Sequence, residues 1–503
     1  MKRIIAIVIT ICLMASVLCI PAFALIEAPT PMGVVIRISA LKKGKDSPVA
    51  IENGEFYSFE DGWNRAMKLA GDRTNGYDRI VVDLLADWHA NKDGEFGSGN
   101  GFNWSTICVP EKARVMLNMN GHTINRGLGD NNEYDGEVIL IKDGADVIIN
   151  GGKNGDPIAN AKTGENVGNV QMGTIKGGNS DNGAGGIHMQ DDSKLTLNNV
   201  NIVGNISDDD DGGGIAVYDG ATLIMNGGSL SNNAIKCTSS QSLEGSSKGV
   251  GAYVEDSTAI LTGVEIKNNQ FYGYHSYGAA ICARNSTVEI YDCIVEGNGI
   301  DDSTDEDREA ANSIFFIWST DFTAVNTDFI NNGSELEGWL YDSIAIWLYP
   351  DDMNILIDGC NFENNNTEYI FDTDISESTD LFVLKTVFKN NKFSIYTGDY
   401  IGSACFESCV FENNKFGTED HAFYIGRFDT LTFRDCDMGD SDFNDKSRVI
   451  FEDADGNQLP ASIFGKGSLT MIVAFAALVA SIAAIMINIS SKKKTASAQK
   501  EQD

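Results

Sequence analysis

The densest group of residues that could carry chemistry is an acidic run, Asp208, Asp209, Asp210 and Asp211, which three glycines follow. Several carboxylates on a flexible segment can hold a hard cation, and Ca²⁺ prefers such oxygen ligands. Charged residues beside glycine are equally typical of a solvated turn between two strands. The run is therefore a candidate Ca²⁺ site, and a plain turn is the alternative interpretation.

Aromatic residues form the second candidate site: Trp318, Trp339, Tyr341, Trp347 and Tyr349. Around Trp347 and Tyr349 aliphatic and aromatic residues alternate, so on an extended strand the two kinds face opposite sides. If the aliphatic side is buried, the aromatic side points outward, where rings can stack on sugars or on a partner protein. We therefore predict a ligand-binding face here. The alternative is that a loop or the flank of the domain covers these rings.

The rest of the sequence offers no catalytic constellation. The five histidines stand apart, and His188 has Ala216 at the equivalent place of the next repeat. No GxSxG nucleophile motif occurs, and the glycine-rich segments lack the lysine and the helix of a phosphate loop. The sequence therefore assigns no catalytic residue.

The candidate residues belong to a repeated pattern that recurs from Gly185 onward. Nine residues share one register position: Val200, Gly228, Val264, Cys293, Thr327, Cys360, Thr386, Cys409 and Cys436. Mostly apolar residues stand five and three residues before this position and two residues after it, so they face one side of extended strands. The interval varies from 23 residues (Thr386 to Cys409) to 36 (Gly228 to Val264). A parallel β-solenoid accounts for this, because each repeat is one coil and loops absorb the length differences. Leucine-rich repeats are disfavoured, since the LxxLxL spacing is missing.

Asparagine follows the register position by five residues in eight repeats: Asn205, Asn233, Asn269, Asn298, Asn332, Asn365, Asn391 and Asn414. Asparagine tolerates left-handed backbone geometry, and its amide can bond to the asparagine of the next coil. We therefore predict a structural asparagine ladder along one corner of the solenoid. Four cysteines share the register position with valines, which indicates small buried residues rather than metal ligands.

The segment 58–70 predicts a helix that would close the open end of the first coil. Ser58 suits the N-cap, two acidic residues follow in the first turn, and Gly71 stands past the end. An open solenoid end exposes unpaired strand edges and apolar side chains, so a cap is expected there. Residues 25–79 are therefore predicted to form an N-terminal cap region.

Both ends of the chain predict export and anchoring. Lys2 and Arg3 precede an apolar run and small residues up to Ala24, which indicates a signal peptide over residues 1–24. A retained signal anchor is the alternative. Residues 468–490 are apolar over the length that spans a bilayer, and the basic tail 491–503 belongs on the cytoplasmic side. Residues 452–467 would link the solenoid to this span. Leu459–Ser462 (LPAS) resembles a cell-wall sorting signal, but departs from LPxTG, so wall attachment is the less favoured outcome.

The charge balance excludes one class of partner. Lys and Arg number 37 against 72 Asp and Glu, which gives a formal charge of −35. Such a surface repels nucleic acid, so no nucleic-acid role is expected. The membrane and a glycan or protein ligand remain as the predicted partners.

Two motifs point to a known family. The segment Val115 to Ile124 (VMLNMNGHTI) resembles the opening of bacterial right-handed parallel β-helix repeat proteins, which have the pectate-lyase-like superfamily fold. The glycine-rich steps before Ile187 and Ile215, with the F-x-x-N of Phe362–Asn365, resemble polymorphic-membrane-protein and adhesin repeats. The resemblance implies the fold, but this fold carries adhesins, polysaccharide lyases and glycoside hydrolases alike.

These patterns together predict an all-β protein with a single right-handed parallel β-helix over residues 80–451. An N-terminal helical cap and a C-terminal transmembrane helix complete the predicted architecture, with the body outside the cell. The predicted function is a non-enzymatic, adhesin-like binder of glycans or proteins. The alternatives are a polysaccharide lyase or glycoside hydrolase, and a purely structural surface-layer component.

Overall fold

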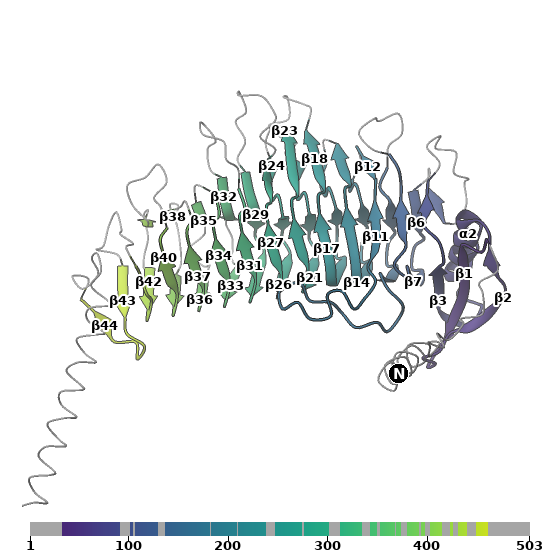
Figure 1. Ribbon diagram of the computed structural model, residues 1–503, viewed down its shortest axis with the longest axis horizontal. Helices are drawn as coiled ribbons and strands as arrows, with labels where there is room; N and C mark the ends of the chain where they lie inside the picture. The colour runs from purple at the N-terminus through teal and green to yellow at the C-terminus, as the bar shows by residue number, and fades with distance from the viewer. Residues whose placement is uncertain are drawn as a thin grey trace, which may run out of the picture.

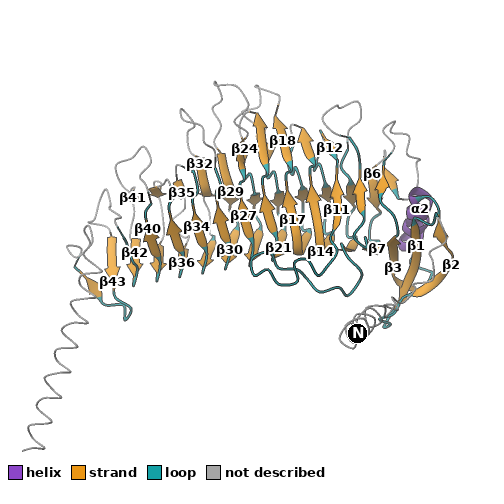
Figure 2. Ribbon diagram, viewed as in Figure 1, coloured by secondary structure: helices purple, strands orange, loops and turns teal. Residues whose placement is uncertain are grey.

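The computed structural model describes residues 33–460, except 91–100, 104–105, 129–135, 182, 209, 238–246, 274–275, 301–311, 334–342, 350–352, 368, 374–379, 392–393, 398–402, 415–422, 426–430 and 440–448. The described strands stack along one long axis (Figure 1) and form sheets of 25, 12, five and two strands. Figure 2 shows that strands and short loops make up nearly all of this body. Successive coils pair in parallel, which is the defining feature of a β-solenoid, and antiparallel pairs occur near the two ends of the stack.

The 25-stranded sheet consists of two ladders that join in two long strands. Its first ladder contains β3 (Tyr77–Leu84), β7 (Arg114–Asn118), β10 (Asp146–Asn150), β14 (Lys194–Val203), β17 (Thr222–Ser231), β21 (Thr258–Thr262), β26 (Thr287–Tyr291), β30 (Asp321–Val325), β33 (Asn354–Asp358), β36 (Asp380–Leu384), β39 (Ser403–Glu407), β42 (Leu431–Arg434) and β43 (Val449–Glu452). Its second ladder shares β14 and β17 and adds β4 (Trp88–His89), β8 (Thr123–Asn125), β11 (Gly173–Lys176), β22 (Glu265–Lys267), β27 (Ile294–Glu296), β31 (Asp328–Ile330), β34 (Asn361–Glu363), β37 (Val387–Lys389) and β40 (Val410–Glu412).

The other sheets complete each coil. The five-stranded sheet contains β12 (Asn179–Ser180), β15 (Ile206–Asp208), β18 (Ala234–Cys237), β23 (Gln270–Gly273) and β28 (Gly299–Ile300). The 12-stranded sheet contains β5 (Phe102–Asn103), β6 (Thr106–Val109), β9 (Ile139–Ile141), β13 (Ile187–Met189), β16 (Ile215–Val217), β20 (Ala252–Glu255), β25 (Ile281–Arg284), β29 (Asn312–Trp318), β32 (Ser343–Tyr349), β35 (Tyr369–Thr373), β38 (Ser394–Thr397) and β41 (Phe423–Ile425). A small pair, β19 (Ser247–Lys248) and β24 (Ser276–Tyr277), lies just before two of these strands in the chain.

The repeat register predicted from the sequence is confirmed in the strand pairing. Leu195 pairs with Leu223, which pairs with Ala259, and the same column continues coil by coil to Leu431. Two residues past the register position, four phenylalanines form one buried stack: Phe329, Phe362, Phe388 and Phe411. Their ring centroids lie 4.4, 5.1 and 4.9 Å apart, and their planes are nearly parallel. The inward columns therefore fill the bore with interlocking apolar side chains.

The eight asparagines that follow the register position are joined by side-chain hydrogen bonds. Each Nδ2 donates to the Oδ1 of the next asparagine, at distances between 2.9 and 3.2 Å. Each backbone N–H donates to the same oxygen, as from Asn298 to Asn332 at 3.1 Å. The expectation that these residues adopt left-handed geometry is wrong. The positive φ belongs to the residue before each of them, such as Asn331 (+54°) and Gly297 (+66°). That residue turns the chain, and the turn directs the next side chain inward.

A second amide ladder runs along the outside of the first coils, and the sequence analysis did not predict it. Asn226 donates to Asn198 at 3.0 Å, Asn198 to Asn150 at 2.9 Å, and Asn150 to Asn118 at 2.8 Å. Asn118 donates in turn to the carboxylate of Asp83 at 2.8 Å. These residues stand two positions before the register residue. The ladder stabilises the half of the solenoid that lies nearest to the N-terminus.

The first coil is flanked by antiparallel strands and a helix. β1 (Ile36–Lys42) pairs antiparallel with both β2 (Val49–Phe56) and β3. The predicted helix is present as α2 (Phe59–Gly71), and the Ser58 side chain accepts the Asp61 N–H at 3.2 Å. Trp63 and Met67 on its inner side are buried in the same core as the strands of the first coil. Figure 1 shows α2 beside β1 at this end of the stack.

The far end of the stack also finishes in an antiparallel pair. β44 (Gln458–Leu459) folds back on β43 and pairs with it. The first residues of the predicted linker are therefore part of the sheet. The predicted signal peptide (1–24), transmembrane segment (468–490) and cytoplasmic tail (491–503) lie outside the described residues. Among the residues that are described, no helix is both long and apolar enough to cross a membrane.

A long excursion, residues 151–172, leaves the stack and returns to it, and residues 157–163 of it form a strap along one corner. The side chain of Asn199 bonds twice to the strap, at the Pro157 carbonyl (2.9 Å) and the Ala159 N–H (2.8 Å). Further along, the Ala161 N–H donates to the Gly263 carbonyl at 3.0 Å. In Figure 1 this segment passes below β14, β17, β21 and β26. The strap therefore ties several successive coils together.

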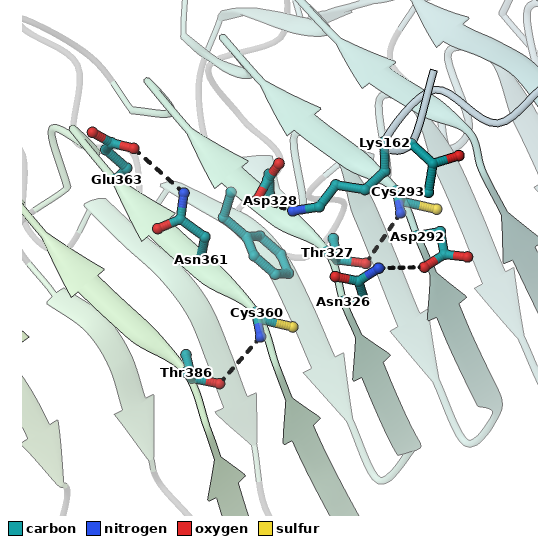
Figure 3. A network of polar contacts seen from close by, with 12 residues as sticks. Lys162, Asp292, Cys293, Asn326, Thr327, Asp328, Cys360, Asn361, Glu363 and Thr386 are labelled. Atoms are coloured by element: carbon teal, nitrogen blue, oxygen red, sulfur yellow. Dashed lines mark hydrogen bonds and ion pairs between the residues drawn. The ribbon is translucent and has the colours of Figure 1, made fainter. Parts of the chain in front are cut away.

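The strap is held at its far end by an ion pair. Lys162 extends from the strap to Asp328, next to the hydrogen bond between Asn326 and Asp292 (Figure 3). The side chains of Lys162 and Asp328 are 19% and 18% exposed, so water screens the pair only partly. Asn160 adds a bond to Asp292 at 3.3 Å. The strap is thus anchored on coils far from its own place in the chain.

Replacing Lys162 with methionine should lower the free energy of unfolding by about 1–2 kcal/mol, because Asp328 keeps its partial burial and loses its cation. Urea denaturation monitored by tryptophan fluorescence measures this change. Lys385→Met is the matched control, since Lys385 also faces an aspartate but is 70% exposed. Equal effects of the two variants would contradict an anchoring role for Lys162.

Candidate functional site

The outer face of the 12-stranded sheet carries most of the unusual side chains, and we call it the aromatic face. Along β13, β16, β20, β25 and β29 one row of residues points away from the bore. This row consists of His188, Ala216, Tyr253, Cys282 and Phe316, which pair in register. Their neighbours in the chain, such as Ile187 and Ile215, are fully buried in the core. Strand alternation therefore positions this row.

The aromatic face forms a small second core on the outside of the solenoid. Ala216, Tyr253, Cys282 and Phe316 are at most 5% exposed, although they point away from the bore. A second row of rings, Tyr218, Tyr277 and Trp318, is partly buried and packs over them. Tyr277 lies 4.7 Å from Phe316 between ring centroids. The partly exposed second row is the surface that a ligand would meet.

Trp318 lies at one end of this surface. The Arg284 guanidinium stands 4.5 Å from the centroid of its ring, and Phe316 meets it edge-on at 6.2 Å. Arg284 also pairs with Glu255 at 3.2 Å. Cation–π contact and ion pair together hold the indole in one orientation. Trp318 is therefore a rigid, half-buried ring rather than a freely exposed one.

The structure describes the other predicted aromatic residues only in part. Trp347 and Tyr349 lie in β32, where their backbones pair with Phe316 and Trp318 of β29. Their side chains, and the whole of Trp339 and Tyr341, lie outside the described residues. The strand register thus places the backbone of β32 beside β29, one coil beyond Trp318.

The acidic run lies at the other end of the same face, at the turn before β16. Asp208 ends β15, and Asp209 is outside the described residues. Asp210 accepts the Gly183 N–H at 2.6 Å and the Asp211 N–H at 2.7 Å. Asp211 accepts the Lys248 N–H at 2.7 Å. Within the described part of the chain, no three His, Cys, Asp or Glu side chains are grouped to hold a metal ion. The carboxylates of Asp210 and Asp211 therefore accept hydrogen bonds from backbone N–H groups of the loops.

Burial is the largest cause of the pKa shifts of Asp211, His188 and Tyr253 at this end of the aromatic face. It raises the pKa of Asp211 to about 7, with Asp210 and Glu255 adding to the rise and the Lys248 charge opposing it. Burial also lowers the pKa of His188, against the attraction of Asp210. The pKa of the Tyr253 hydroxyl is raised, first by burial and then by Asp211. At neutral pH the imidazole and the phenol are therefore uncharged.

Four polar groups converge here without a hydrogen bond or ion pair to any described residue. They are the imidazole of His188, the hydroxyls of Tyr218 and Tyr253, and the ammonium of Lys248. The His188 and Tyr218 rings lie 5.3 Å apart, and those of Tyr218 and Tyr253 lie 5.5 Å apart. The Lys248 Nζ stands 5.9 Å from the centroid of the Tyr253 ring. Their donors and acceptors are available to a ligand.

The residues that lie between the two candidate clusters were not predicted from the sequence. Ala216 occupies the position of His188 in the next coil, and it offers no partner for the imidazole. The structure shows that the ring neighbour of His188 is Tyr218, which lies two residues further along β16 and the turn after it. Tyr253 directly follows the inward-facing Ala252 and occupies the same repeat position as Ala216. Alignment of the repeats in register would therefore have revealed it. Lys248 had no such signal, because it comes from an insertion.

Comparison with known proteins agrees with this architecture. The model of the family described as right handed beta helix region matches residues 239–444. No curated protein and no solved structure matches the chain. With the parallel strand stack, the family match shows that the chain is a parallel β-helix repeat protein.

Proposed function

We propose that this protein is a membrane-anchored cell-surface binder that holds a glycan or a protein ligand on the aromatic face. The observation that supports this most is the set of partly buried rings on this face, Tyr218, Tyr277 and Trp318, which pack on the small external core. Aromatic rings supply much of the binding energy at glycan and protein interfaces. The parallel ladder holds these rings in place before a ligand arrives, so little entropy is lost on binding.

The proposal includes the ends of the chain. Residues 1–24 would direct export, residues 468–490 would span the membrane, and residues 491–503 would remain in the cytoplasm. α2 would cap the solenoid at the end far from the membrane, since its apolar side packs on the first coil. The solenoid would then act as a rigid stalk that presents the aromatic face away from the membrane surface.

One observation supports an enzymatic alternative. A carboxyl group whose pKa is about 7 can act as a general acid at neutral pH, and Asp211 lies beside a second carboxylate. Against this, Asp211 already accepts the Lys248 N–H and is only partly exposed. A carbohydrate-active enzyme therefore stands as the second candidate.

Replacing Trp318 with alanine should weaken binding about tenfold or more, because it removes a rigid ring from the ligand surface. A glycan array and a protein-binding screen with the purified protein, with and without Ca²⁺, provide the measurement. Phe382→Ala is the control, since Phe382 is 43% exposed on the 25-stranded sheet. Its affinity should match that of the wild type.

The same screen includes a test for polysaccharide degradation. Release of reducing or unsaturated sugars would replace the binder with the enzyme. If neither binding nor polysaccharide degradation is detected, a structural surface-layer component becomes the favoured function. Equal losses in Trp318→Ala and Phe382→Ala would contradict the aromatic face as the binding site.

A further inference from the structure

We propose that Cys409 and Cys436, two thiols in adjacent coils near the end of the solenoid, become linked by a disulfide bond. Both residues occupy the register position, which holds buried side chains from coil to coil. The proposal adds a covalent modification site to the fold and does not depend on the aromatic face or on a ligand. The proposed export of the chain would place the pair in an oxidising compartment, where disulfides persist.

The backbones of the two cysteines lie side by side in neighbouring coils. The Asp437 N–H donates to the Cys409 carbonyl at 2.9 Å, and the Phe411 N–H donates to the Asp437 carbonyl at 2.8 Å. Val410 and Asp437 form a parallel bridge. Neighbouring strands lie about 4.8 Å apart, and a disulfide spans Cα atoms that are about 4.4–6.8 Å apart. The backbone thus already places Cys436 within reach of Cys409.

The sulfur atom of Cys436 points toward Cys409. Its Sγ accepts the Cys409 N–H at 3.4 Å, and its S–H donates to the Phe406 carbonyl, on the same coil as Cys409, at 3.3 Å. The two thiols also interact directly, and this contact raises the pKa of Cys436 more than its burial does. The Cys409 S–H donates to the Val383 carbonyl of the preceding coil at 3.3 Å. Rotation of this one side chain about its Cα–Cβ bond would turn its sulfur toward Cys436.

The other cysteines of the register position are separated by threonines. Among the described cysteines at this position, only the proposed pair occupies adjacent coils. Thr327 lies between Cys293 and Cys360, and its hydroxyl accepts the Cys293 N–H at 3.3 Å (Figure 3). Thr386 separates Cys360 from Cys409 and accepts the Cys360 N–H at 3.3 Å. A hydroxyl group can therefore replace the sulfur as an acceptor, but it cannot form the covalent bond.

Bond formation requires an oxidant that takes up two electrons, and a small disulfide such as oxidised glutathione supplies this chemistry. The thiolate of one cysteine attacks a sulfur of the oxidant, which releases one thiol and leaves a mixed disulfide. The second thiolate attacks the protein sulfur of that mixed disulfide, so the new S–S bond forms and the second thiol leaves. The protons of Cys409 and Cys436 pass to the two released thiolates. Because both thiols are buried, the reaction is expected during folding or when the last coils open.

Equilibration of the full-length protein with oxidised and reduced glutathione, just below the urea midpoint, tests the proposal. After free thiols are blocked with N-ethylmaleimide, mass spectrometry of the digest should show a linkage between Cys409 and Cys436. It should exceed any linkage of Cys293 or Cys360 by about tenfold or more, because only the proposed pair lies within disulfide reach. Cys436→Thr should abolish the linkage and keep the fold, since Thr386 shows that threonine can supply the backbone acceptor. Cys293→Thr is the matched control, and its yield of the linkage should equal that of the wild type.

Hydrogen exchange provides a second readout. The two cysteines are 27 positions apart in the chain, so the bond would close a loop and limit the opening of β39, β40 and β42. Amide exchange in these strands should slow about tenfold or more on oxidation, and dithiothreitol should reverse the change. Free thiols at both positions after equilibration would overturn the proposal. A dominant linkage of either cysteine to Cys405, which lies on the outer side of β39, would also overturn it.

Failure of this proposal and failure of the proposed function are distinguishable. The linkage is measured without a ligand, and binding to the aromatic face is measured on other strands. Cys436→Thr should therefore leave the affinity for any ligand of the aromatic face unchanged.

Discussion

Asn332→Ala is expected to lower the free energy of unfolding by about 3–5 kcal/mol, since it leaves several buried polar groups without partners. The Asn332 Oδ1 accepts from the backbone and the side chain of Asn298, both at 3.1 Å. Its Nδ2 donates to the Val295 carbonyl at 2.9 Å and to Asn365 at 3.1 Å. The side chain is 1% exposed, so water cannot replace these bonds in the folded state.

The destabilisation by Asn332→Ala should first affect the coils next to the substituted residue. The ladder joins each coil to its two neighbours, so the stack is weakened most where the ladder is interrupted. Amide hydrogen exchange should therefore accelerate first in β27, β31 and β34, and urea denaturation should give the overall change. Asn331→Gly is the matched control, because Asn331 is exposed and has a φ of +54°, which glycine adopts without strain. A similar loss in both variants would show that the corner turn, rather than the ladder, stabilises the coil.

The pairing of the coils could be predicted because one physical rule governs it. Side chains alternate along a strand, so buried columns at Leu195 and Phe362 recur with a spacing of two and reveal the register. The asparagine column could be predicted in the same way, because each asparagine stands five residues after the register position. The residue that takes the left-handed conformation was assigned wrongly, since both Asn331 and Asn332 suit a corner and composition alone does not separate them.

The strap, and the contribution of Lys248 to the aromatic face, could not be predicted, because both come from insertions that differ from coil to coil. Lys162 reaches Asp328 across several coils, and no repeat contains a signal for that distance. Lys248 likewise comes from a segment outside the repeat. The acidic run and Trp318 were each found as separate candidates. Only the parallel stacking of β13 to β29 shows that they belong to one face.

Asp211→Asn is expected to stabilise the protein at alkaline pH and to have little effect at acidic pH. The pKa of Asp211 is about 7 in the folded protein, against an ordinary value of 3.8. Below about pH 3 the carboxyl is mostly protonated in both states and contributes little difference. As pH rises toward 7, the unfolded chain ionises first, so the folded state loses stability, and the full loss is present above pH 7. Asparagine is neutral at every pH and retains an oxygen for the Lys248 N–H.

The gain of Asp211→Asn over the wild type should therefore grow from near zero at pH 4 to on the order of 4 kcal/mol above pH 8. Urea midpoints at pH 4.5, 6.5 and 8.5 provide the measurement. Asp219→Asn is the control, because it makes the same change at a residue that lies exposed in the turn after β16. A gain that is constant across this range would mean that Asp211 is ionised throughout. In that case the Lys248 charge would outweigh the burial of Asp211, and the carboxylate would remain charged in the folded protein.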